Sequence, residues 1–131
     1  MNAFLSEEKA SLANASVSRE HIFAALRAVL PAHALLSSGE NTTPYECDGL
    51  TAYRQRPMCV VLPETYQQIQ DVLRTCHRLG VPVVARGAGT GLSGGAMPHA
   101  LGVTLSLAKF NKILRLDPLS RTAVEIGRAH V

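Results

Sequence analysis

The chain has 131 residues, of which 47% are hydrophobic and 18% charged, and its formal net charge is +3. This composition predicts a globular domain of ordinary size with a real core, and it excludes a disordered chain. The basic residues are scattered and Trp is absent, so a nucleic-acid interface is not expected.

The cysteines and the apolar stretches bear on the compartment. Cys47, Cys59 and Cys76 are odd in number and widely spaced, which argues against a disulfide framework and for reducing surroundings. No stretch approaches the roughly 18 apolar residues of a membrane span. The amino terminus lacks the basic-then-apolar pattern of a signal peptide. We therefore expect a cytoplasmic protein without a transmembrane segment.

The first 43 residues predict a helical arm. Residues 1–17 are polar and rich in Ala, with a short helix expected around residues 4–13. A stronger helix follows, capped by Ser18 and ending at Pro31. Its apolar stripe consists of Ile22, Leu26, Val29 and Leu30. Residues 37–56 are predicted to be a loop, because Gly, Pro, Asn and Ser recur there.

The middle of the chain predicts a strand–helix–strand unit. Residues 58–62 form an apolar run between prolines, typical of a buried strand. Thr65 and Gln68 fit a capping box that starts a helix, and Gly80 fits the position just beyond its end. The strand at 81–85 should then lie parallel to the first, through a right-handed crossover. Further strands are expected at 102–108 and, as a hairpin, at 112–116 and 121–125.

A glycine-rich stretch separates two of these strands. Five of the ten glycines fall within residues 86–95. Such a backbone can direct successive N–H groups at an anion, for example a diphosphate. Residues 89–94 match G-x-G-x-x-G literally, but Gly95 and Pro98 interrupt the helix that the dinucleotide fingerprint requires. No Lys-Ser/Thr follows, which excludes a P-loop. We therefore predict a loop that binds phosphate through its backbone, with no helix.

Arg86, at the start of this stretch, has two interpretations. It can support the phosphate, or it can simply extend from a strand end into solvent. The other candidate residues give weaker signals. The five histidines have no ligand spacing, so we expect no metal site. Glu46 and Asp48 could be a carboxylate pair, but loop carboxylates at this spacing usually bond nearby backbone.

These residues carry a resemblance to a known family. Residues 82–95 resemble the pyrophosphate loop of the vanillyl-alcohol-oxidase, or PCMH-type, FAD-binding flavoproteins. Residues 44–50, with Ala52-Tyr53-Arg54 and Arg56-Pro57, are similar to the FAD subunits of bacterial glycolate oxidases in particular. The resemblance runs from about residue 43 to residue 124. It implies an α+β fold, in which N-terminal helices, a βαβ unit and further strands form the first subdomain of a PCMH-type FAD-binding domain.

The resemblance also implies a cofactor site. The residues that would line the FAD diphosphate through their backbone are Arg86, Gly87, Ala88, Gly89, Thr90, Gly91, Leu92, Ser93 and Gly94. Several relatives have a histidine at the position of Thr90 that bonds flavin covalently, so its absence here implies noncovalent FAD. The family's catalytic residues lie in segments that follow the matched region, and we assign no catalytic residue in this chain.

The activity implied is that of a flavin-dependent 2-hydroxy-acid (glycolate) oxidase or dehydrogenase, with hydride passing from the substrate α-carbon to flavin N5. Other oxidase subunits would carry the electrons onward, and could hold the protein at the inner membrane. A D-lactate dehydrogenase-type enzyme and a non-catalytic nucleotide- or phosphate-binding module are the alternatives.

The resemblance also sets domain limits. We expect a helical arm at 1–43 and the first, incomplete part of the FAD-binding domain at 44–124. Residues 125–131 replace an expected Pro-Gly turn, and we interpret them as a non-native tail, with a genuine terminal strand as the alternative.

Overall fold

A four-stranded sheet forms the centre of the molecule in a computed structural model that describes residues 17–127. Its strands are β1 (Leu35–Leu36), β2 (Cys59–Val61), β3 (Val83–Arg86) and β4 (Val103–Ser106), in the spatial order β1-β2-β4-β3. β4 pairs in parallel with both β2 and β3, whereas β1 is antiparallel to β2. The helix expected around residues 4–13 lies outside the described residues.

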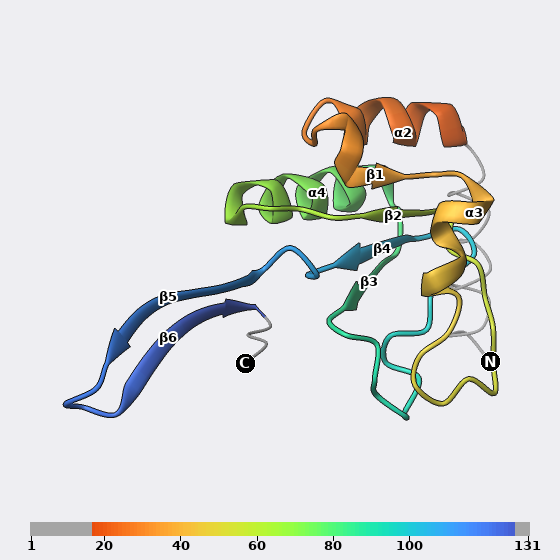
Figure 1. Cartoon of the computed structure of the whole chain (residues 1–131). Helices are drawn as coiled ribbons and strands as arrows, with labels where there is room; N and C mark the ends of the chain where they lie inside the picture. The colour runs from red at the N-terminus through yellow and green to blue at the C-terminus, as the bar shows by residue number, and fades with distance from the viewer. Residues whose placement is uncertain (1–16, 128–131) are drawn as a thin grey trace, which may run out of the picture.

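Two helices cover one face of this sheet. In Figure 1, α2 (Arg19–Arg27) lies above the strands, α4 (Tyr66–Leu79) lies at the level of β1 and β2, and the long loops lie below. The core joins apolar side chains of both helices to those of β2 and β4, namely Ile22, Leu26, Val72, Cys76, Cys59, Val61, Val103 and Leu105. The mixture of helices with parallel and antiparallel strands confirms the predicted α+β class.

The caps of both helices follow the sequence signals. The hydroxyl of Ser18 accepts a hydrogen bond from the N–H of His21, and that of Thr65 accepts one from Gln68. Gly80 adopts the left-handed conformation (φ 65°) that ends α4. α2 ends at Arg27, four residues before Pro31, because the N–H of Val29 bonds the carbonyl of Leu26 and so tightens the last turn.

One prediction about the first half of the chain needs correction, and one is confirmed with an addition. Residues 37–56 are not wholly loop, since α3 (Gly39–Thr42) and a 3-10 turn (Thr43–Tyr45) lie there, and Ser38 caps α3. The strands of the strand–helix–strand unit are parallel, as predicted, but they are not neighbours. β4 lies between β2 and β3, because its Val103, Thr104 and Leu105 pair with residues of both.

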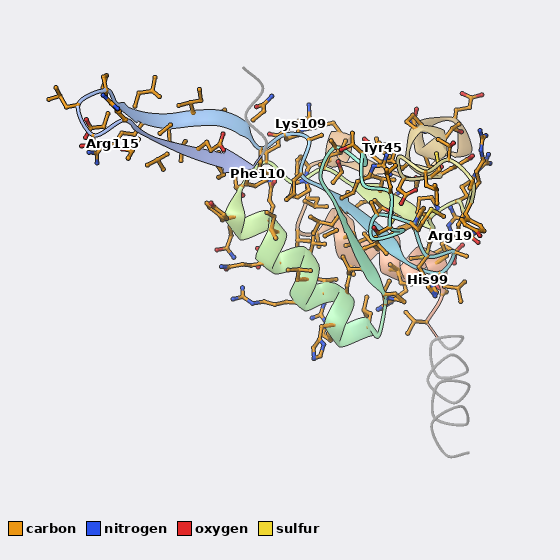
Figure 2. All side chains as sticks on the ribbon, turned by 90° about the horizontal axis from the view of Figure 1, so that it is seen from below. Arg19, Tyr45, His99, Lys109, Phe110 and Arg115 are labelled. Atoms are coloured by element: carbon orange, nitrogen blue, oxygen red, sulfur yellow. The ribbon has the colours of Figure 1, made fainter. Side chains whose placement is uncertain are left out.

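The last strands form a separate hairpin, as predicted. β5 (Asn111–Asp117) and β6 (Thr122–Gly127) pair with each other and with no other strand of the described chain. Figure 1 shows this hairpin projecting from the side of the sheet. It begins after Phe110, which is buried and has its ring 5.8 Å from that of Tyr66. Figure 2 shows Lys109 and Phe110 at this junction and Arg115 far out on the hairpin.

β6 contains residues 125–127, the start of the segment interpreted as a tail, and residues 128–131 lie outside the described range. Among residues 17–127, no helix is long and apolar enough to cross a membrane.

Candidate functional site

The glycine-rich stretch is the connection between β3 and β4. Because these strands are parallel, the chain must travel from the carboxyl end of β3 back to the amino end of β4. It does so through residues 87–102 without any helix or strand. The prediction of a glycine loop that has no helix is therefore confirmed, and the geometry differs from the dinucleotide fingerprint and from a P-loop.

Most N–H groups in the first half of this loop have no hydrogen-bond partner among the described residues. From Gly87 to Ser93, none donates a hydrogen bond to another group of residues 17–127. The next N–H, that of Gly94, is bound by the carboxylate of Asp48 at 2.8 Å. Adjacent free N–H groups at the end of a strand form the kind of concave surface that binds anions. The hydroxyl-bearing Thr90 and Ser93 are exposed on the same loop.

Two kinds of glycine occur in the loop. Gly89 (φ 73°) and Gly94 (φ 79°) have backbone angles that other residues rarely adopt, so the turn itself requires them. Gly87 and Gly91 have no positive φ, and a Cβ added to either would meet nothing within 4 Å. The fold gives no reason for glycine at these two positions. Close approach of a ligand to the backbone gives one, so the loop fits a bound diphosphate.

Arg86 does not extend into solvent. Its side chain is buried, with 9% of the residue exposed, and its Nη1 donates to the carbonyl oxygen of Cys47 at 2.7 Å. The guanidinium also lies 5.5 Å from the centre of the Tyr45 ring and against Gly89. Arg86 therefore holds Tyr45 and Cys47, in the loop that precedes β2, against the start of the glycine loop. It also places a positive charge beside the free N–H groups.

Asp48 makes a second link to the loop, which the sequence did not reveal. It is 4% exposed, and its Oδ1 accepts from the N–H of Leu50 at 3.0 Å while Oδ2 accepts from Gly94. The N–H of Gly49 donates to the carbonyl of Gly91 at 2.9 Å, and a Cβ on Gly49 would lie 2.6 Å from the carbonyl oxygen of Thr90. The Asp-Gly pair thus fixes the far side of the loop.

Glu46 does not pair with Asp48; it makes an ion pair with Arg56 at 2.7 Å. The prediction that Asp48 bonds only nearby backbone is thus half right, because one of its oxygens reaches a residue 46 positions away.

A cavity of about 290 Å³ adjoins the first residues of the loop. It is lined by Tyr45, Arg86, Gly87, Ala88, Ser106 and Asn111, among others. The strand ends of β3 and β4 and the start of β5 thus surround one space next to the free N–H groups of Gly87 and Ala88. No group of three or more His, Cys, Asp or Glu side chains among residues 17–127 could hold a metal ion.

Comparisons with known proteins agree with this geometry. The family model of the FAD binding domain matches residues 57–127. The glycolate oxidase subunit GlcD of Escherichia coli K12 is 50% identical over 121 residues, which are 92% of this chain and 24% of the relative. The mitochondrial D-2-hydroxyglutarate dehydrogenase of Bos taurus is 31% identical over 109 residues, 83% of this chain and 20% of the relative. The chain thus spans a quarter or less of the length of the curated relatives it matches.

Solved structures give the same fold. p-Cresol methylhydroxylase with substrate bound matches with a TM-score of 0.66 and 27% identity, over 76% of this chain and 20% of that one. Alkyldihydroxyacetonephosphate synthase matches with a TM-score of 0.70 at 18% identity, over 79% and 21% of the two chains, which supports the fold alone. With the matching family model and a loop that fits a diphosphate, these likenesses show that the chain belongs to the FAD-binding domain family of PCMH-type flavoproteins, and that its cofactor is FAD.

Proposed function

We propose that this chain supplies the diphosphate-binding part of a flavin-dependent 2-hydroxy-acid dehydrogenase, with residues 86–94 lining the FAD diphosphate. The observation that carries the proposal is the row of free N–H groups from Gly87 to Ser93, with open space at Gly87 and Gly91. Bound FAD would supply the redox chemistry by accepting hydride at N5 from the substrate α-carbon. The residues of this chain bind and orient it.

The energetics favour a backbone site. Each hydrogen bond from an N–H to a charged phosphate contributes roughly 1.5–3 kcal/mol. Four or five of them would contribute roughly 6–15 kcal/mol, which is similar to the 4–15 kcal/mol cost of association. The carboxylate of Asp48 lies near the same loop, but it is engaged by two N–H groups and so repels an anion less. These N–H groups alone therefore support weak binding, and tight binding needs contacts to the rest of FAD.

The substrate is proposed from the relatives' names. Glycolate, D-2-hydroxyglutarate and D-lactate are all 2-hydroxy acids. We propose glycolate, since the GlcD relative has the higher identity, with D-lactate as the alternative. GlcD is a subunit of glycolate oxidase, and this supports the proposal that other subunits carry the electrons onward. The protein would then be cytoplasmic, or held at the inner membrane by those partners.

The domain limits are also proposals. The contacts of Arg86 and Asp48 with the glycine loop support a domain that begins near residue 44, before the matched region. The interpretation of 125–131 as a non-native tail stays a prediction. Noncovalent FAD is proposed because Thr90 offers no ring nitrogen for a flavin bond; flavin that stays attached after denaturation would contradict it.

The test compares two valine variants of equal size. Gly91→Val should abolish flavin binding while the protein stays folded, since its Cβ meets nothing in the protein but would enter the phosphate site. Gly95→Val is the matched control, because its Cβ also meets nothing within 4 Å and it lies outside the proposed site. FAD binding is followed by flavin fluorescence and folding by circular dichroism. Unchanged FAD binding by Gly91→Val would refute the site.

A further inference from the structure

The glycine loop has charges of opposite sign at its two ends. At its start, the buried guanidinium of Arg86 lies against Gly89. At its far end, the carboxylate of Asp48 accepts a hydrogen bond from the N–H of Gly94 at 2.8 Å, and only 4% of Asp48 is exposed. An anion held by the N–H groups of the loop therefore lies between a buried positive group and a buried negative group.

The carboxylate of Asp48 lies close enough to such an anion to repel it. Consecutive backbone nitrogens are less than about 4 Å apart, so Oδ2 of Asp48 is within about 7 Å of the nitrogen of Ser93. A phosphate oxygen bound to that N–H would lie within about 10 Å of the carboxylate. This distance is similar to the Debye length of about 8 Å at physiological ionic strength, and buried charges are screened less than exposed ones.

The groups that surround Asp48 reduce this repulsion but do not remove it. Its two hydrogen-bond donors are the N–H groups of Leu50 and Gly94, which are dipoles and not charges. No Lys, Arg or His nitrogen lies within 4.0 Å of its carboxylate among residues 17–127. The repulsion grows with the charge on the phosphate. At pH 7 a terminal phosphate carries about 1.5–2 negative charges, whereas a phosphate esterified on both sides carries one.

We propose that Asp48 makes the glycine loop selective for a diphosphate that is esterified at both ends, as in FAD, over a diphosphate with free ends. This selectivity rests on the proposed function, since it requires that residues 86–94 bind a diphosphate. A nucleoside diphosphate can turn its esterified phosphate toward Asp48. Inorganic pyrophosphate has two terminal phosphates and must place one of them there, so it should be disfavoured most.

The test compares ADP-ribose, whose diphosphate is esterified at both ends, with inorganic pyrophosphate on the 131-residue chain in low-salt buffer at pH 7. Amide chemical-shift titrations give both dissociation constants. Asp48→Asn removes the charge and keeps the size of the side chain. It should lower the Kd of pyrophosphate relative to that of ADP-ribose about fourfold, for one extra unit charge at about 10 Å and an effective dielectric constant of about 40. An unchanged ratio would overturn the proposal, because a loop that is only loosened binds both ligands less well.

Two further variants separate charge from structure. Asp117→Asn makes the same change of charge at a distant place, since Asp117 lies six residues along β5 from Asn111, which lines the cavity beside the loop, or about 20 Å away. Asp48→Glu keeps the charge and should keep the ratio of the two dissociation constants, even if both ligands bind less tightly. A ratio that changes as much in either variant as in Asp48→Asn would overturn the proposal.

Salt dependence provides a measurement on the unmodified chain. Because the charges of Arg86 and Asp48 oppose each other, raising the salt concentration from about 0.05 to about 0.2 M should weaken ADP-ribose binding less than about twofold. Weakening of fivefold or more would indicate a site of net positive charge and would overturn the proposal. If neither ligand shifts the amides from Gly87 to Ser93, the proposed function itself is refuted; if the amides shift and the ratio does not change in Asp48→Asn, the selectivity alone is refuted.

Discussion

Replacing Gly89 with Ala should destabilise the protein through Arg86. The backbone at Gly89 has a φ of 73°, which Ala adopts only at a cost of about 1–2 kcal/mol. The added methyl group would also overlap the guanidinium of Arg86, whose Nε would lie 2.7 Å from it. This guanidinium is buried, so the clash must displace it or move the loop.

The magnitude follows from what Arg86 would lose. Its charge-assisted hydrogen bond to the carbonyl of Cys47, 2.7 Å long, is worth about 1.5–3 kcal/mol. Its contact with the ring of Tyr45 adds about 0.5–1 kcal/mol. With the backbone cost, Gly89→Ala should lower the free energy of unfolding by about 3–6 kcal/mol.

Urea unfolding followed by circular dichroism measures this loss, since the chain has no Trp. Gly91→Ala is the matched control and should change the free energy of unfolding by less than about 0.5 kcal/mol, because nothing lies within 4 Å of the added methyl group. In an Arg86→Ala background, the cost of Gly89→Ala should fall to the backbone part alone. A loss below 1 kcal/mol in the wild-type background would refute the argument.

Three other predictions concern buried polar groups. Asp48→Asn should cost about 1.5–3 kcal/mol and speed hydrogen exchange at the Gly94 amide, and unchanged exchange would contradict the link. Burial raises the pKa of the Cys59 thiol to about 12 and that of Cys76 to about 11. The two protonated thiols therefore contribute fully to stability below pH 9, and this contribution is lost as the pH rises through the two raised pKa values. A free energy of unfolding that does not change between pH 8 and pH 11 would contradict this. Thr104→Val should leave stability unchanged or raise it by about 1–2 kcal/mol, because this buried hydroxyl has no hydrogen-bond partner within residues 17–127, and a clear loss in urea unfolding would show a missed partner.

The features predicted correctly are those with local signals. α4 was predicted from its Thr65 cap and its Gly80 end, and both interactions involve residues within a few positions. The hairpin is predicted because residues 117–120 contain Asp, Pro and Ser, which are typical of a turn. In the structure, the carboxylate of Asp117 accepts hydrogen bonds from the N–H and the hydroxyl of Ser120. These hydrogen bonds lower the pKa of the Asp117 carboxyl group. The absence of the helix that a dinucleotide fingerprint requires is likewise predicted from a local signal, the proline at position 98.

The features that were missed depend on contacts between distant parts of the chain. β1 has two residues, too few for a period, and exists because Leu35 and Leu36 pair with β2. The position of β4 between β2 and β3 is decided by pairing across the sheet, which a strand–helix–strand pattern does not specify. The bond from Gly94 to Asp48 spans 46 positions. Asp48 is predicted to bond nearby backbone, whereas its bond to Gly94 exists only when the glycine loop is folded beside it.

The most direct test of the central claim is an amide chemical-shift titration of the 131-residue chain with FAD. We predict weak binding, with a Kd on the order of 1 mM or about 4 kcal/mol, because the free N–H groups contribute little more than association costs. The shifts should concentrate at the N–H groups from Gly87 to Ser93, and ADP, which carries the same diphosphate, should reproduce them while riboflavin should not. Shifts that avoid these residues, or that riboflavin reproduces, would contradict the claim that this loop binds the FAD diphosphate.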